Sequence, residues 1–106
     1  MNTYFFEINN SVWYIKEIEN HKIQEKFGIE GEYLHGITIY SKNTIYLNKE
    51  SPEMERTLKH ELMHVWLYIY GHNQDEKQFN NEDVCEIVAS SNDFINEIVS
   101  KYFKER

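Results

Sequence analysis

An apolar repeat with helical spacing between residues 51 and 71 constrains the fold of this chain more than any other feature. Its apolar members recur at steps of three and four residues: Met54, Leu58, Leu62, Val65 and Ile69. Residues with this spacing share one face of a helix, which is buried against another element. Ser51 is a favourable N-cap, Pro52 suits the first helical position and Gly71 favours termination. The pattern therefore predicts an amphipathic helix from Ser51 to Gly71.

A second helix is predicted after a polar segment at residues 72–79. Asn80 or Asn81 is a suitable cap, and Glu82 and Asp83 follow in the first turn, where the helix dipole favours negative charge. The helix runs to about Phe103, and its expected core face has seven members: Val84, Ile87, Val88, Ser91, Ile95, Ile98 and Val99. The second half of the chain is therefore predicted to be helical.

The first half of the chain is rich in β-branched and aromatic residues and predicts short strands. The strand segments are separated by turn residues: Tyr4–Ile8, Val12–Ile15, Gly36–Tyr40 and Thr44–Leu47. Asn9 and Asn10 indicate a turn between the first two, and residues 41–43 suggest a hairpin between the last two. Residues 16–27 are compatible with a short helix that ends at Gly28. The sum is one α+β domain over residues 1–106, a small antiparallel sheet covered by two long helices.

The composition indicates in which compartment the protein works and which classes of partner it does not bind. A chain of 106 residues with one cysteine, Cys85, has no internal disulfide, so a metal ion is the remaining strong cross-link. The net charge of −7 argues against nucleic acid or an anionic membrane as partner. The N-terminal residues lack the basic start and cleavage site of a signal peptide, and no apolar run approaches the roughly 20 residues of a membrane span. We therefore expect a cytoplasmic protein.

Within the first predicted helix, residues 60–64 read His-Glu-Leu-Met-His, the HExxH pattern of zinc metallopeptidases. Residues four apart lie one above the other on a helix, so the imidazoles of His60 and His64 can converge on one ion. Glu61 lies about 100° further round the helix, where its carboxylate can take a proton from water. The alternative is two surface histidines and an ordinary glutamate, which the apolar flanks of the motif disfavour. The pattern predicts one Zn²⁺ held by His60 and His64, with Glu61 as the catalytic base.

A catalytic zinc site keeps three protein ligands and one open position, so a third ligand is expected from another element. The second predicted helix carries Glu82 and Glu86 on one face. We favour Glu82 as the ligand, while Glu86 either orients a histidine ligand through a hydrogen bond or takes the ligand role itself. The alternative is that Glu82 and Asp83 only complement the positive end of the helix dipole.

These motifs resemble the gluzincins, the thermolysin-like class of zinc metallopeptidases. The likeness rests on residues 60–64, followed by Asn81-Glu82 and an acid four residues further on, Glu86. More narrowly, Gly36 to Ile98 resembles small metallopeptidase-like proteins of phages and mobile elements, in which aspartate is expected at position 86. The resemblance implies a minimal zincin-like fold with zinc as cofactor. It also implies a peptidase activity, since some of these proteins cleave repressors of phages or mobile elements.

Three further residues are candidates for stabilising the oxyanion of the transition state: Tyr68, Tyr70 and His72. Aromatic residues at this spacing also suit a core, and a histidine at a helix C-terminus is favourable for dipole reasons alone. The strand Thr44–Leu47 precedes the motif helix, and in zincins such an edge strand pairs with an extended peptide substrate. The alternative is that this strand is only half of a hairpin. Cys85 can reach the metal, but we expect a buried thiol.

The preferred function is therefore a cytoplasmic zinc endopeptidase that hydrolyses a peptide bond of another protein, such as a regulator of a phage or mobile element. A chain of this size has few residues with which to form a cleft that selects a substrate. We therefore expect a partner protein to contribute to specificity. The rival is a zinc-stabilised interaction domain without turnover. Glu61 favours the enzyme, because a structural site has no use for a glutamate there, whereas Cys85 as a fourth ligand would favour the rival.

Overall fold

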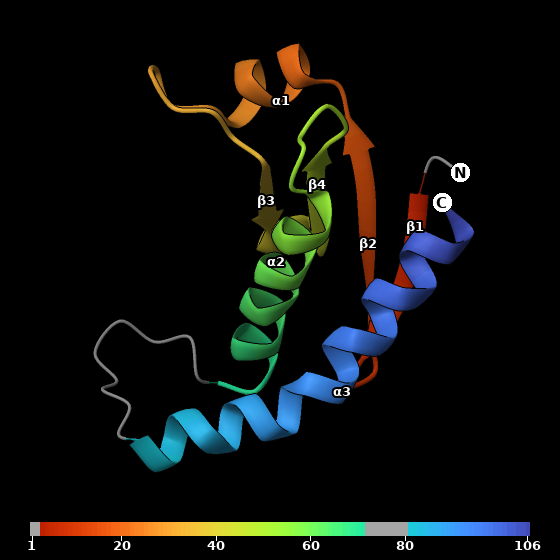
Figure 1. Cartoon of the computed structure of the whole chain (residues 1–106), viewed down its shortest axis with the longest axis vertical. Coiled ribbons are helices and arrows are strands. Elements are labelled where there is room, and N and C mark those ends of the chain that lie inside the picture. The colour runs from red at the N-terminus through yellow and green to blue at the C-terminus, as the bar shows by residue number, and fades with distance from the viewer. Residues whose placement is uncertain (1–2, 72–80) are drawn as a thin grey trace.

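The computed structural model describes residues 3–71 and 81–106, and Figure 1 shows how their elements are arranged. A four-stranded sheet forms the centre, in the order β1-β2-β4-β3. The strands are β1 (Thr3–Ile8), β2 (Ser11–Ile18), β3 (Gly36–Ile39) and β4 (Thr44–Asn48). The helices are α1 (Asn20–Phe27), α2 (Met54–Ile69) and α3 (Asn81–Glu105), with a short 3-10 turn, η1 (Tyr40–Lys42), between β3 and β4. The predicted α+β class and the two long helices are confirmed.

Two antiparallel hairpins build the sheet, as predicted. β1 pairs with β2, and the turn between them holds Asn9 at a φ of 47° and Asn10 at a φ of 64°. Asparagine tolerates the left-handed backbone that a two-residue hairpin turn requires at both positions. β3 pairs with β4, and Asn43, with a φ of 48°, turns the chain into β4.

The pairing between the two hairpins differs from the predicted antiparallel sheet. β2 and β4 run parallel, with Tyr14 opposite Thr44 and Ile18 opposite Asn48. After β2 the chain passes through α1 and β3, and this crossover returns β4 in the direction of β2. The sheet is therefore mixed, and β4 lies inside it. The prediction of Thr44–Leu47 as an edge strand is wrong, because β3 forms that edge.

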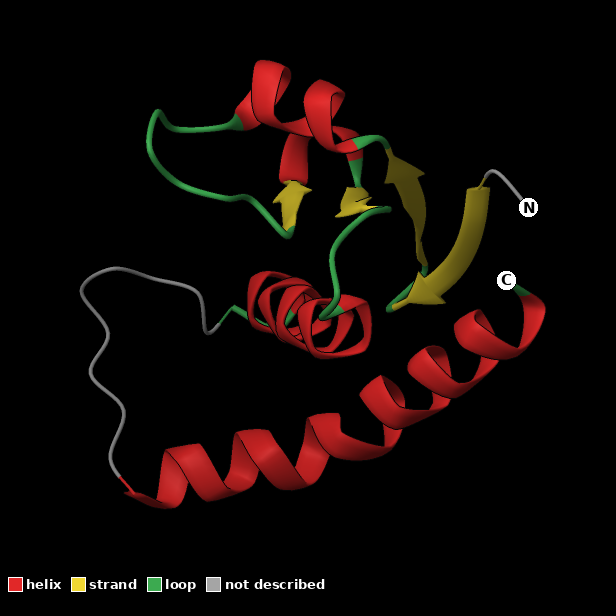
Figure 2. Ribbon diagram, turned by 45° about the horizontal axis from the view of Figure 1, so that its top comes forward, coloured by secondary structure: helices red, strands yellow, loops and turns green. Residues whose placement is uncertain are grey.

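Helices lie on both faces of the sheet, α1 on one side and the two long helices on the other (Figure 2). On β4, Tyr46 alternates with Ile45 and Leu47 and faces α1, where its ring centroid lies 5.2 Å from that of Phe27. The main core lies on the opposite side. It comprises Phe6, Ile8, Trp13, Ile15, Ile45 and Leu47 of the sheet, Leu58, Leu62 and Val65 of α2, and Ile95, Ile98, Val99 and Tyr102 of α3.

α2 begins at Met54, so the prediction of Ser51 as its N-cap is wrong. Ser51 is buried one turn earlier, where its Oγ accepts the backbone N–H of Glu53 at 3.1 Å and lies 2.6 Å from Nδ1 of His35. The serine therefore fixes the turn that leads into the helix. The predicted stop is confirmed, because α2 ends at Ile69 and Gly71 adopts a φ of 76°.

Only the C-terminal half of α3 joins the core. The buried residues of α3 are Ser91, Ile95, Ile98, Val99 and Tyr102. In contrast, Val84 is 49% and Val88 is 52% exposed. Cys85 is also exposed. Figures 1 and 2 show the reason, since the N-terminal half of α3 extends beyond the sheet. The predictions of Val84 and Val88 as core residues and of Cys85 as a buried thiol are therefore wrong.

The C-terminal end of α3 is held to β2 by a carboxylate. Glu17 on β2 accepts hydrogen bonds from Nε and Nη2 of Arg106 at 2.7 and 3.1 Å, and another from the hydroxyl of the buried Tyr102. Burial raises the pKa of Glu17, but the hydrogen bonds from Arg106 and Tyr102 outweigh it and lower that pKa below its ordinary value. This cluster fixes how α3 lies across the sheet.

β3 lies unusually close to α2, and a glycine makes this possible. A Cβ atom on Gly36 would lie 2.6 Å from Cγ2 of Thr57 and 3.0 Å from the carbonyl oxygen of Tyr46. The close approach brings the edge strand against the helix that carries the HExxH motif. None of the helices within residues 3–71 and 81–106 is long and apolar enough to cross a membrane.

Candidate metal centre

The two motif histidines converge on the solvent-facing side of α2. Their Nε2 atoms lie 3.1 Å apart, and their ring planes meet at 81°. Two nitrogen ligands of a tetrahedral zinc, each about 2.0–2.1 Å from the ion, lie about 3.3 Å apart. The separation between His60 and His64 therefore suits two ligands of one ion. It also suits a single N–H···N hydrogen bond between the rings when no ion is bound.

Glu61 points the other way round the helix, toward β3. Its side chain is 10% exposed, whereas the side chain of His60 is 69% exposed. The Thr38 hydroxyl on β3 donates a hydrogen bond to Oε1 of Glu61 at 2.8 Å. Oε2 lies 3.9 Å from Nε2 of His60. One oxygen of the carboxylate is thus held by the sheet and the other lies toward the histidines.

A buried carboxylate is costly unless a cation or several hydrogen bonds compensate its charge. Within residues 3–71 and 81–106, no lysine or arginine lies within 4.0 Å of the Glu61 carboxylate, and Thr38 is its hydrogen-bond donor. The helix nevertheless keeps this acid at the position where the motif predicts a catalytic base. A buried carboxylate beside two imidazoles is therefore a candidate for a chemical task, in metal binding or proton transfer.

The three motif side chains form a donor set for a metal. One nitrogen from each histidine and one oxygen of Glu61 all lie within 4.8 Å of one another. In the part of the chain that the structure describes, no other trio of histidine, cysteine or acid residues is gathered in this way. Imidazole nitrogens with a carboxylate suit Zn²⁺, so the residues present fit the predicted cofactor.

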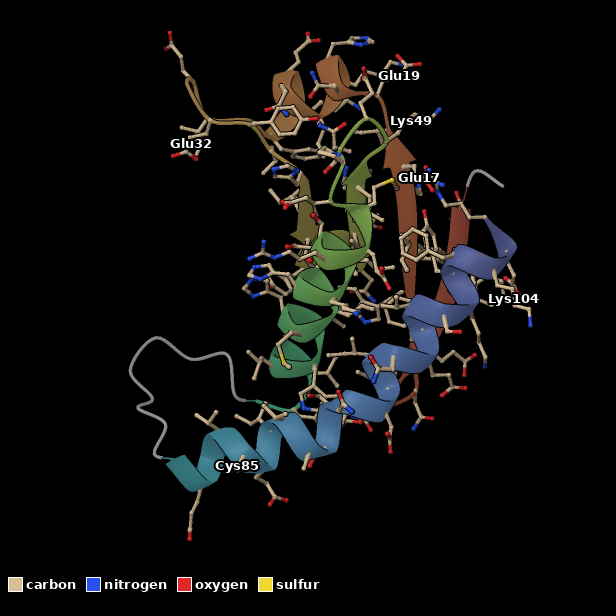
Figure 3. The ribbon with its side chains drawn as sticks, viewed as in Figure 1. Glu17, Glu19, Glu32, Lys49, Cys85 and Lys104 are labelled. Atoms are coloured by element: carbon tan, nitrogen blue, oxygen red, sulfur yellow. The ribbon has the colours of Figure 1, made fainter. Side chains whose placement is uncertain are left out.

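Glu82 and Glu86 lie outside this donor set. Both are exposed on the N-terminal half of α3, and with Cys85 and Ala89 they line a separate, open hollow. Figure 3 labels Cys85, which marks this part of the helix. The structure thus brings together three of the predicted site residues, and the ligand role of Glu82, or of Glu86, stays a prediction.

The three candidates for oxyanion stabilisation fall in different places. Tyr68 lies one turn after His64 on the same helix stripe, is 44% exposed and packs with its ring centroid 4.6 Å from that of Tyr40. Tyr70 lies about 240° round the helix from His64, and its ring packs 4.4 Å from that of Trp66. His72 lies outside the described residues. Tyr68 is therefore the better placed of the two tyrosines.

The open edge of the sheet runs beside the donor set. The backbone N–H of Asn48 donates to the carbonyl of His35 at 2.8 Å, which makes these residues a hydrogen-bonded pair. Bonded and non-bonded pairs alternate along an antiparallel ladder, so the backbone groups of Gly36 and Thr38 point away from β4. No strand among residues 3–71 and 81–106 pairs with this side of β3, so an extended chain can pair with these outward groups.

A pocket of about 290 Å³ adjoins the same edge. It lies between the segment before β3 and the first turns of α2, with Tyr33, His35 and Arg56 in its walls and His60 and Glu61 at one end. A volume of this size accommodates one side chain of a bound peptide. The pocket and the free edge of β3 were not predicted from the sequence, because both arise where distant segments meet.

Thr38 was also missed from the sequence. Its β-branched side chain is ordinary for a strand, and nothing in its neighbours marks it as a partner of a residue 23 positions later. Only the packing of β3 on α2 reveals the contact.

Comparisons with known proteins found no relative for this chain. No protein-family model matches it, and neither the curated proteins nor the solved structures contain a match. The HExxH motif and the geometry around it are therefore the evidence for function.

Proposed function

We propose that this protein is a zinc-dependent endopeptidase that hydrolyses a peptide bond of a cytoplasmic protein. The observation that carries the proposal is the placement of Glu61. It is a buried carboxylate without a lysine or arginine partner among the described residues, and it lies beside two imidazoles whose Nε2 atoms are 3.1 Å apart. A core with no chemical task would favour an apolar residue at this position.

His60 and His64 would hold the metal, with Glu82 as the expected third ligand and Glu86 as the alternative. Zn²⁺ supplies a Lewis acid that polarises a carbonyl and lowers the pKa of a coordinated water. The exposure of His60 leaves one side of the site open to substrate. A zinc-stabilised binding domain would instead need four protein ligands and would have no use for a buried glutamate beside the histidines.

Glu61 would act as the proton carrier. Its Oε2, which is free of Thr38, accepts a proton as the oxygen of water bonds to the scissile carbonyl carbon. The same proton passes to the amide nitrogen as the C–N bond breaks. Water is thereby divided between the two products, an acid and an amine, and Glu61 returns to its carboxylate form.

The free edge of β3 indicates how a substrate would bind. Gly36 and Thr38 offer outward backbone groups to an extended peptide, and the adjoining pocket offers room for one of its side chains. We propose a regulatory protein of a phage or mobile element as the target, in keeping with the resemblance of the sequence. Specificity in so small a protein would be shared with a partner protein.

Glu61→Gln tests this function, because it keeps the shape and removes the proton acceptor. Wild type and variant are incubated with cell lysate or with co-expressed regulators, and new N-termini are compared by mass spectrometry. Cleavage should fall by at least about a hundredfold in the variant, the low end of what a positioned acid–base group contributes. Its zinc content and melting temperature serve as controls for folding. Identical fragments from both proteins, or no fragments from wild type with any regulator, would contradict the proposal.

A further inference from the structure

We infer that Thr38 is a positioning residue that keeps Glu61 off the metal, so that this carboxylate remains a base instead of becoming a ligand. The inference rests on the proposed metal site, which it deepens. It concerns a residue on the edge strand that the sequence pattern does not mark.

The contact itself is short and shielded from water. Oγ1 of Thr38 lies 2.8 Å from Oε1 of Glu61, and the two residues are 8% and 7% exposed. A hydroxyl bonded to a carboxylate in such surroundings makes a strong, charge-assisted hydrogen bond. Because β3 is locked to α2 by the close approach at Gly36, the hydroxyl is presented from a fixed position.

The geometry also shows what the contact prevents. An oxygen of Glu61 lies within 4.8 Å of the nitrogens of both histidines, so a modest rotation of the side chain can bring it onto a shared ion. Carboxylate oxygens bind zinc readily, at about 2.0–2.2 Å. A Glu61 bound in this way would occupy the position that a catalytic zinc keeps open for water. The Thr38 hydroxyl opposes this rotation by holding the carboxylate against the sheet.

A purely structural role predicts something different. If the hydroxyl only compensates a buried charge, its loss lowers stability and leaves the coordination of the ion unchanged. If it holds Glu61 away, its loss changes the ligand set. Metal affinity and the spectrum of a bound cobalt ion distinguish the two roles without any need for turnover.

The test uses Thr38→Val, which keeps the β-branched shape and removes the donor. Zinc affinity of the purified chain should rise, because the freed carboxylate adds a ligand. We expect a change of about tenfold, equal in size to the low end of the losses seen when groups that orient ligands are removed, but opposite in direction. The visible absorption of the Co²⁺-loaded protein should change with it, because a carboxylate replaces water in the ligand set. Thr38→Ser retains the hydroxyl and should behave as wild type.

Two further variants make the result specific. In a Glu61→Gln background, Thr38→Val should no longer tighten zinc binding, because the competing carboxylate is absent. Thr44→Val removes a hydroxyl from another buried threonine of the same sheet, one that donates to the carbonyl of Lys42 at 2.8 Å, and should leave affinity and spectrum unchanged. If Thr38→Val fails to fold, Thr38→Ala provides the same loss of donor with less crowding.

Unchanged zinc affinity and an unchanged cobalt spectrum in Thr38→Val would overturn the inference, and so would an equal effect in the Glu61→Gln background. A wild-type chain that binds no zinc would overturn the metal site as well, which is a separable result. With a cleaved substrate in hand, Thr38→Val should lower kcat and leave KM nearly unchanged, as expected for a residue that acts through the base.

Discussion

The Nε2 atoms of His60 and His64 lie 3.1 Å apart across one turn of α2, while Glu61 between them turns into the protein and meets Thr38 of β3. One turn of helix thus places an exposed and a half-buried imidazole on one side and turns a buried carboxylate to the sheet. This division follows from the angle of about 100° between successive residues of a helix. In the proposed function, the exposed side of α2 would bind the metal and the buried side would carry the proton.

Loss of the histidines should remove the metal. His60→Ala and His64→Ala are each expected to lower the zinc content of the purified protein from one equivalent toward zero, measured by elemental analysis. Chelation should lower the melting temperature of wild type and leave the double variant unaffected, because metal binding stabilises only the folded state. His21→Ala, at an exposed position on α1, is the matched control. Stoichiometric zinc in the double variant would contradict the site.

The third ligand can be identified by comparing two glutamates on one helix face. Glu82→Ala should abolish tight zinc binding, whereas Glu86→Ala should weaken it by about 10–100-fold, as expected for a residue that only orients a ligand. Both side chains are exposed on α3, so neither change should disturb the core. Titration with a competing chelator measures both affinities. The reverse order would assign the ligand role to Glu86, and an unchanged affinity in both would exclude α3 as the source.

The attachment of α3 to β2 should make the protein sensitive to acid. The pKa of Glu17 is lowered below its ordinary value of 4.5, so the folded state binds this proton less tightly than the unfolded state. The contribution of ionised Glu17 to stability is therefore complete above about pH 4.5. It is lost as the pH falls through the lower pKa that Glu17 has in the folded state. Arg106→Ala should cost about 1 kcal/mol at pH 7, a value suited to a partly exposed bidentate pair. The loss of unfolding free energy caused by Arg106→Ala should be smaller at pH 3, where protonation of Glu17 weakens the pair.

Urea unfolding at both pH values measures this difference. Lys101→Ala is the control, because Lys101 pairs with Glu97 on the surface of the same helix and touches neither β2 nor Glu17. If Arg106→Ala lowers the free energy of unfolding equally at pH 3 and pH 7, the charge of Glu17 does not have the proposed role.

The two halves of α3 should respond differently to the same substitution. Val99→Ala removes two methyl groups from the core and should cost about 2 kcal/mol. Val88→Ala, at a position 52% exposed, should change stability by less than about 0.5 kcal/mol. Alanine also has the higher helix propensity, which favours the exposed variant slightly. Urea unfolding measures both changes. If Val88→Ala and Val99→Ala lower the free energy of unfolding equally, the N-terminal half of α3 is packed in solution.

The helical register of α2 and the distribution of the motif side chains round it were determined by the sequence alone. The spacing of four between His60 and His64 places them on one stripe wherever the helix lies, and the position of Glu61 beside them follows from the same local geometry. The turn at Asn9 and Asn10 and the stop at Gly71 are equally local, because they depend on which residues tolerate a positive φ. Local backbone preferences act within a few residues, so sequence patterns report them well.

The partners that meet across the fold were decided only by the tertiary structure. Whether β4 lies at an edge or inside the sheet depends on the crossover through α1 and β3, which no local pattern specifies. The burial of Val99 and the exposure of Val88 depend on where the sheet ends beneath α3, although both residues belong to the same helical stripe. The hydrogen bond from Thr38 to Glu61 exists because Gly36 lets β3 approach α2. Contacts between distant segments depend on the packing of the whole chain, and the apolar repeat of one helix does not specify them.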